Sequence, residues 1–221
     1  DGVTGVQTCA LPICADNVLM FGIGAVQRRL APLVNAEAPP FRSAGISSGD
    51  VLRVADIASG SVSFAPGEWA AAVAALEQEW RRALLHGFTA PEIEAQVESL
   101  RTSQKNQAER ENTRTTGALM NQLLSSVQND TVFATPSSGL ARFEAWAAEV
   151  TPEVVHKAFV QHMSIGTPLF FIASSVEDEG LGDGVIAAWS ESAAVDVAPP
   201  EARKRIPFTY TNFGRPGRVV S

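Results

Sequence analysis

Cysteine and histidine are scarce in this sequence, which limits its scope for redox and metal chemistry. The 221 residues include two cysteines, Cys9 and Cys14, both among the first fourteen positions. The four residues between them do not match the two-residue spacing of a redox or zinc pair. Because no cysteine follows position 14, we expect neither a disulfide framework nor a cysteine nucleophile in the rest of the chain.

Excess basic charge and long apolar runs are missing as well. Lys and Arg together number 17 against 24 Asp and Glu, which gives a net charge of -7. Nucleic acids and anionic membrane surfaces are bound through basic patches, so neither is expected as a partner, and Arg203-Lys204-Arg205 is a small local exception. No run of about 18 apolar residues is present to span a membrane. With 45% apolar and 19% charged residues, the composition is that of a soluble globular protein.

The three histidines, His86, His156 and His162, form no recognisable zinc motif. Neither H-E-x-x-H nor H-x-x-E-H occurs, and no Asp, Glu and His cluster has the spacing of metal ligands on a helix. The Gly-x-Ser-x-Gly turn of serine hydrolases is also absent. We therefore predict no catalytic, cofactor-binding or metal-binding residue, and expect the histidines at helix ends or on the surface. A surface array of ion pairs is expected from Glu92, Glu94, Glu98 and Arg101.

The first fourteen residues, DGVTGVQTCALPIC, show neither a helical nor a strand pattern. They also lack the basic segment, apolar core and small-residue cleavage site of a targeting peptide. The stretch from Val3 to Ile13 resembles the translation of a common sequencing-library adaptor. We therefore expect residues 1–14 to be an artefactual leader, of which 1–13 are the translated adaptor.

Apolar residues at spacings of three and four predict a helix over 16–34. Gly22 and Gly24 weaken this helix slightly but allow close packing against it. The pair lacks the third glycine and the preceding strand of a dinucleotide-binding loop, so we do not expect phosphate binding here.

A hairpin is expected after this helix. The stretches 41–47 and 51–58 have strand-like composition, and the link Ser48-Gly49-Asp50 between them predicts a tight turn. We interpret 61–64 as the continuation of the second strand after a bulge at Gly60.

The segment 67–88 predicts the clearest helix of the chain. Its apolar residues recur at spacings of four, three, four and four, so they should form one buried stripe. Glu77 and Arg81 are expected to pair on the solvated side. The stripe consists of Trp69, Val73, Leu76, Trp80 and Leu84.

A sharp corner is predicted at the end of this helix. Gly87 is suited to a left-handed cap, and Phe88 can fold back onto the last turn. Thr89 and Glu92 match a capping box that starts the next helix at once.

The next helix is either long or broken near Gly117. Its polar middle, from Arg101 to Thr116, is predicted to be a solvated face, with an edge facing a cavity or a partner as the alternative. Three further helices and a strand are expected. The first helix is 139–149 and the last is 183–194. The helix between them is capped by Thr151, and its inner face consists of Val154, Val155, Ala158 and Phe159. The strand is 169–173, expected to be buried on both faces.

The order of these features resembles the pitrilysin/insulinase family of zinc metallopeptidases. The matching stretches are RRLAPLVNAEAPPFRSA, EWAAAVAALEQEWRRALLHGFTAPEIE and VTPEVVHKAF leading into TPLFFIASS. The resemblance covers about residues 16–176. It implies an α+β fold with a mixed, largely antiparallel sheet covered by helices, as in the mitochondrial-processing-peptidase-like metallohydrolases, here truncated at the N-terminus. It further implies an incomplete, inactive-type domain over 15–194 and an interdomain linker over 195–221.

The resemblance is to the second, zinc-free unit of a domain pair. In that family the zinc motif lies in the first unit, and the second unit closes against it around the substrate. The implied function is a non-catalytic, substrate-enclosing part of a zinc-dependent metalloendopeptidase, and the alternative is a catalytically dead structural or partner subunit. The implied partners are an upstream catalytic domain holding the zinc, a downstream half of the same polypeptide, and a peptide substrate. The periplasm is the compartment that resemblance to long bacterial members suggests.

Overall fold

The computed structural model of the chain describes residues 12–51, 55–164, 166–175 and 180–201. The expected leader up to residue 11 and the expected linker from residue 202 onward lie outside these ranges. In chain order the described elements are α1 (Pro12–Leu30), η1 (Ala31–Asn35), β1 (Ser43–Val51), β2 (Ala55–Ser63), α2 (Trp69–His86), α3 (Ala90–Glu109), η2 (Glu111–Thr113), α4 (Thr116–Gln128), α5 (Pro136–Ala147), α6 (Pro152–Met163) and α7 (Leu181–Ala193).

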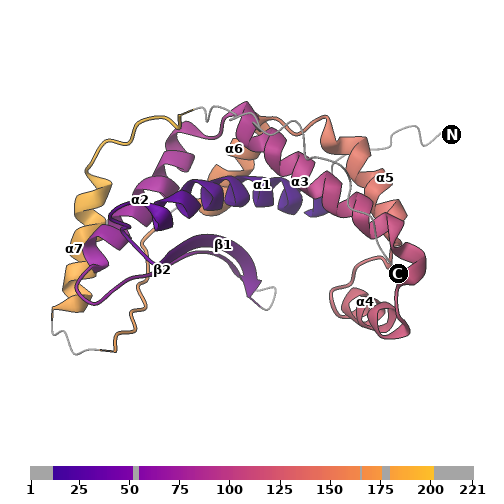
Figure 1. Ribbon diagram of the computed structural model, residues 1–221, viewed down its shortest axis with the longest axis horizontal. Helices are drawn as coiled ribbons and strands as arrows, with labels where there is room; N and C mark the ends of the chain where they lie inside the picture. The colour runs from indigo at the N-terminus through magenta and orange to yellow at the C-terminus, as the bar shows by residue number, and fades with distance from the viewer. Residues whose placement is uncertain (1–11, 52–54, 165, 176–179, 202–221) are drawn as a thin grey trace, which may run out of the picture.

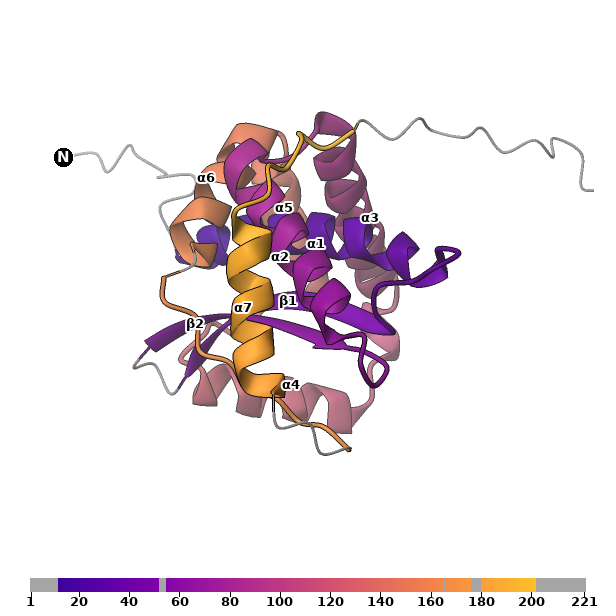
Figure 2. The same ribbon diagram turned by 90° about the vertical axis from the view of Figure 1, so that its left-hand side faces the viewer.

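Helices cover one side of an antiparallel β-hairpin, which confirms the α+β class. Figure 1 shows α1, α2, α3 and α6 above the hairpin, with α7 beside α2 at one end of the molecule and α5 at the other. Helix α4 lies on the side of the helical layer where the hairpin lies, toward the α5 end, and Figure 2 shows it below the hairpin. Within the described residues the sheet consists of β1 and β2 alone.

The hairpin turns later than the sequence suggested. Ser48, Gly49 and Asp50 belong to β1 and pair with Ala58, Ile57 and Asp56 of β2, so the turn predicted at 48–50 was wrong. Residues 61–63 do continue the second strand, as expected. The prediction of a bulge at Gly60 was wrong, because Gly60 pairs regularly with Ile46.

Gly60 is instead explained by packing. A Cβ atom at this position would lie 2.8 Å from the indole ring of Trp80, so the backbone of β2 runs directly against α2. Gly22 has the same role in α1, where a Cβ atom would lie 2.8 Å from the ring of Phe159 on α6. The close packing predicted for the helix 16–34 is therefore confirmed at Gly22.

The two tryptophans of α2 belong to different apolar clusters. Trp80 is buried in the main core, and its indole N–H donates to the carbonyl of Met163 at 3.0 Å. Trp69 is partly exposed and packs on a smaller cluster formed by Val73 with Leu181 and Val185 of α7. The predicted stripe exists, but α7 covers one end of it and the hairpin and α6 cover the other.

The pair Glu77–Arg81 forms, but not on a solvated face. Glu77 is only 2% exposed, and its carboxylate accepts from Arg81 Nε at 2.6 Å and from Ser192 Oγ of α7 at 2.6 Å. Helix α7 lies over this turn of α2 and excludes water from it. Spacing within α2 alone predicts the ion pair but cannot show which element lies over it.

The corner after α2 agrees with the prediction. Gly87 has a φ of 67°, a region that favours glycine, and Phe88 is buried against Phe159 in an edge-to-face contact. Thr89 and Glu92 form the reciprocal capping box at the start of α3. These local interactions turn the chain sharply between α2 and α3.

The second half of the chain also follows the predicted order of helices. The polar segment is divided into α3 and α4, with the break at η2 and the residues around it, and α5, α6 and α7 match the three helices expected after it. The prediction that Val154 lies inside was wrong, because its side chain is 45% exposed.

The segment 169–173 is not a strand buried on both faces. Leu169 and Phe171 are 98% and 94% exposed, whereas Phe170 and Ile172 pack on the small cluster between α2 and α7. The segment is therefore half-buried, and it has no strand pairing within the described residues. Strand formation needs a partner edge as well as apolar composition, which explains the error.

Candidate functional site

Two of the three histidines are held by main-chain carbonyls. His86 Nε2 lies 2.8 Å from the carbonyl of Val197, and His156 Nε2 lies 2.8 Å from the carbonyl of Leu84. Since a carbonyl can only accept, each Nε2 carries the hydrogen and is not free to bind a metal. In the described part of the chain, no three His, Cys, Asp or Glu side chains lie close enough together to hold a metal ion, so these residues do not fit a zinc site.

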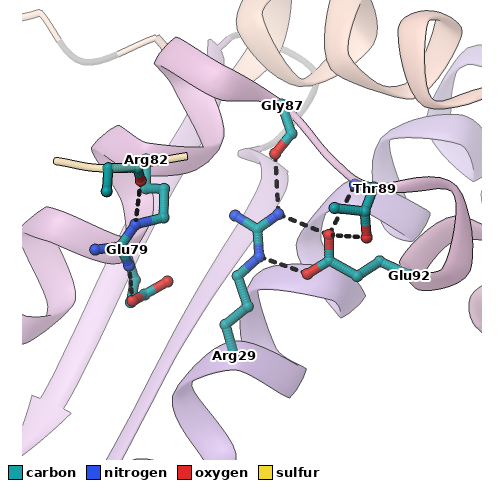
Figure 3. Close-up of polar contacts among 7 residues, drawn as sticks. Arg29, Glu79, Arg82, Gly87, Thr89 and Glu92 are labelled. Carbon is teal, nitrogen blue, oxygen red and sulfur yellow. Dashed lines mark hydrogen bonds and ion pairs between the residues drawn. The ribbon is translucent and has the colours of Figure 1, made fainter. Parts of the chain in front are cut away.

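The corner between α2 and α3 is built around a buried arginine (Figure 3). Arg29 of α1 donates from Nε to Glu92 Oε1 at 2.7 Å, and its Nη2 donates to Glu92 Oε2 and to the Gly87 carbonyl, both at 2.9 Å. The same Glu92 carboxylate accepts from the Thr89 backbone N–H at 2.8 Å. One carboxylate therefore caps α3 and fixes α1 to the corner.

The pKa of Glu92 reflects two opposed influences. Burial on its own would raise the pKa, but the hydrogen bonds from Arg29 and Thr89 and the charge of Arg29 outweigh it and lower the pKa below its ordinary value. Glu92 is thus an ionised structural group, which does not suit it to proton transfer near neutral pH.

Of the other two carboxylates in the predicted surface array, Glu98 forms an ion pair with a described residue and Glu94 does not. Arg101 donates to Glu98 of its own helix at 2.7 Å and to Glu144 of α5 at 3.0 Å. Glu94 forms no ion pair with any described residue. The surface array exists for Glu98 and Arg101, whereas Glu92 belongs to the corner.

The hairpin has an open face of small polar residues on the side away from the helices. Ser47 and Ser59 face each other across the strands with their hydroxyl oxygens 2.8 Å apart. A Cβ atom built on Gly45 or Gly49 would meet no atom within 4 Å, so nothing in the described structure covers this face. The open face consists of Ser43, Gly45, Ser47, Gly49, Ile57, Ser59, Ser61 and Ser63.

Helix α4 has no charged residue and no buried residue. Its attachment to the adjoining chain runs through Gln122, which accepts from Arg114 Nη1 at 2.9 Å and donates to the Ala134 carbonyl at 2.8 Å. Its exposed apolar side chains are Met120, Leu123, Leu124 and Val127. An uncharged helix with this much exposed apolar surface suits contact with another molecule or domain.

A polar cleft of ≈690 Å³ lies between the second half of α3, α4 and the start of α5. Its lining includes Arg110, Arg114 and Arg142 and contains no acidic residue. We call it the basic cleft. Prediction from the sequence missed it, because Arg142 of α5 comes from a different segment than Arg110 and Arg114, although the alternative of a cavity-facing edge for 101–116 pointed toward it.

A larger cleft, of ≈1040 Å³, lies at the corner. Its lining runs from Arg28 and Arg29 over the first turns of α3 to the turn between α5 and α6. Its lining mixes basic with acidic residues, among them Glu92, Glu94 and Glu98, whereas the basic cleft has no acidic residue. Arg29 pairs with Glu92 through Nε and Nη2, and its buried Nη1 has no hydrogen-bond partner among the described residues.

The fold assigns the chain to a class of structure found in large proteases. The crystal structure of the first half of the periplasmic protease PqqL from Escherichia coli matches 85% of this chain at 17% identity with a TM-score of 0.65. The complete PqqL structure matches 90% at 16% identity with a TM-score of 0.66. The ferredoxin protease FusC, as its E83A mutant in complex with Arabidopsis ferredoxin, matches 91% at 17% identity with a TM-score of 0.60.

The chain spans only part of these proteins, 41% of the PqqL first half and 23% of complete PqqL and of FusC. At these identities the similarity establishes the fold, which agrees with the pitrilysin-like fold expected from the sequence. No protein-family profile and no curated protein sequence matches the chain. None of the helices in the described ranges has the length and apolar character needed to cross a membrane.

Proposed function

We propose that this chain is a non-catalytic, substrate-enclosing domain of a zinc-dependent metalloendopeptidase. The observation that carries the proposal is the shared fold with proteases whose chains are much longer than this one. Peptide hydrolysis and the zinc ion that supports it would belong to another domain of the parent protein. By the same similarity, the periplasm is the proposed compartment.

The surface chemistry of the described residues supports this role. The open face of the hairpin and helix α4 lie on one side of the helical layer, and they offer hydroxyl groups, free backbone and exposed apolar side chains. Such a mixture can contact unfolded peptides of varied sequence, because backbone contacts and apolar contacts require no particular residue. Enclosure of the peptide would also separate the reacting bond from bulk solvent, apart from the one water molecule that hydrolysis consumes.

The test is a paired measurement of peptide binding and peptide cleavage by the 221-residue chain. We expect saturable binding of a fluorescently labelled unstructured peptide, followed by fluorescence anisotropy, and no cleavage with added zinc. Leu123→Ser on α4 should weaken binding about fivefold through lost apolar contact. Leu85→Ser is the matched control, since Leu85 is a similarly exposed leucine on α2.

Each contrary outcome has a clear meaning. Zinc-dependent cleavage that a chelator abolishes would refute the non-catalytic role. If the chain bound no peptide, the substrate-enclosing role would be refuted and the alternative of a structural or partner subunit favoured.

A further inference from the structure

The geometry points to the basic cleft as a binding site for acidic segments of peptide substrates, an inference that rests on the proposed function. Three guanidinium groups line one concave surface with no carboxylate among them, in a chain whose net charge is -7. Arg114 lies near the Glu111 carboxylate, whereas Arg110 and Arg142 form no ion pair with any described residue. Such a local reversal of charge is suited to an anionic ligand.

Two of the arginines are free to bind a ligand. Arg110 and Arg142 are exposed, and neither forms an ion pair or a side-chain hydrogen bond with any described residue. The third, Arg114, donates from Nε to the Glu111 carbonyl at 3.1 Å and from Nη1 to Gln122. Hydrogen bonds therefore hold Arg114 in place within the lining, while Arg110 and Arg142 supply unpaired charge to it.

The N-terminus of α5 is not available to bind an anion. Its first two backbone N–H groups already donate within the chain, Ser137 N to Glu111 Oε2 at 2.9 Å and Ser138 N to Thr135 Oγ1 at 3.2 Å. An anion in the cleft would thus be held by guanidinium groups. Guanidinium binds carboxylate in a bidentate, planar arrangement, which favours Asp and Glu side chains.

The peptide assignment follows from what adjoins the cleft. Gln122 and Ser126 of α4 line it, and the same helix carries the exposed leucines Leu123 and Leu124. A ligand crossing α4 would meet apolar surface and then cationic surface. An extended peptide with apolar and acidic residues fits this succession, whereas a free phosphate ion would use the arginines alone.

The experiment compares two unstructured peptides of equal length and apolar content, one with Glu and one with Gln at the same positions. We expect the Glu peptide to bind about fivefold more tightly at low salt, with the preference reduced at physiological ionic strength. The double variant Arg110→Gln/Arg142→Gln should abolish the preference. The control Arg28→Gln/Lys157→Gln removes two exposed charges that do not line the basic cleft and should keep it.

Charge reversal provides a second variant. Arg142→Glu should bring the preference to unity or invert it while leaving the far-ultraviolet circular dichroism unchanged. Equal binding of both peptides to the unaltered chain would refute the inference and leave the proposed function standing, whereas binding of neither would refute both. Displacement of the Glu peptide by micromolar inorganic phosphate would also overturn it, because the cleft would then be a phosphate site.

Discussion

Replacing Glu92 by Gln tests whether one carboxylate holds the corner between α1, α2 and α3. The side chains of Arg29 and Glu92 are 8% and 17% exposed, so their pair is largely shielded from water. Glutamine keeps the size of the side chain and one carbonyl oxygen for the Thr89 N–H, but it removes the charge that Arg29 faces. The Gly87 carbonyl would remain as the other described acceptor for Arg29.

The expected cost can be worked out from these contacts. Hydrogen bonds to charged groups contribute about 1.5–3 kcal/mol each, and breaking a fully buried ion pair costs about 3–5 kcal/mol. Because Glu92 is partly solvated and the carbonyl contact survives, we expect Glu92→Gln to lower the free energy of unfolding by about 2 kcal/mol at pH 7. Glu98→Gln on the same helix should cost below about 0.5 kcal/mol, since Glu98 is 63% exposed and its pair with Arg101 is screened.

The assay is urea unfolding followed by tryptophan fluorescence, repeated across pH. The pKa of Glu92 is lower in the folded protein than the ordinary value of 4.5, so its charge stabilises the fold above that value and the contribution is lost as pH falls through the folded pKa. The difference between the original chain and Glu92→Gln should therefore be constant down to about pH 5.5 and shrink below pH 4.5. A cost at pH 7 no larger than that of Glu98→Gln, or a difference that persists at low pH, would refute this reasoning.

Two further substitutions test how α2 is packed. Gly60→Ala should destabilise the fold by about 1–3 kcal/mol in urea unfolding, because its Cβ would lie 2.8 Å from an indole ring, whereas Gly45→Ala on the open face should be neutral. Equal effects of the two would mean that β2 does not lie against α2. Ser192→Ala should cost about 1–2 kcal/mol by removing a 2.6 Å hydrogen bond to the buried carboxylate on α2, and the control Ser190→Ala, which bonds only within its own helix, should cost far less.

Local interactions made much of this fold predictable. The corner at Gly87 and the capping box of Thr89 and Glu92 depend on residues within a few positions of one another, and all formed as expected. The helices were found for the same reason, because apolar spacing and helix caps are properties of short segments. Errors arose where a distant element decides the outcome, as with the solvation of Glu77 and the pairing of residues 169–173.

The candidate sites were harder to predict. The resemblance to a peptidase family indicated the fold, but the basic cleft requires Arg142 of α5 to come close to Arg110 and Arg114 on either side of η2. Their spacing, four residues and then twenty-eight, matches no motif. The sequence offered one relevant signal, the polar run at 101–116, which is equally typical of an ordinary solvated face.

Three side chains of α2 bind backbone carbonyls at the end of α7 and in the segment that follows it. Arg81 Nη2 donates to the Ser192 carbonyl at 2.9 Å, Arg82 Nε to the Ala198 carbonyl at 2.9 Å, and His86 Nε2 to the Val197 carbonyl. Because every residue type carries a carbonyl, this attachment does not depend on which side chains the held residues bear. Most side chains of residues 194–198 can therefore be substituted while the chain keeps its path over α2. Val197 is the exception, because its side chain is buried.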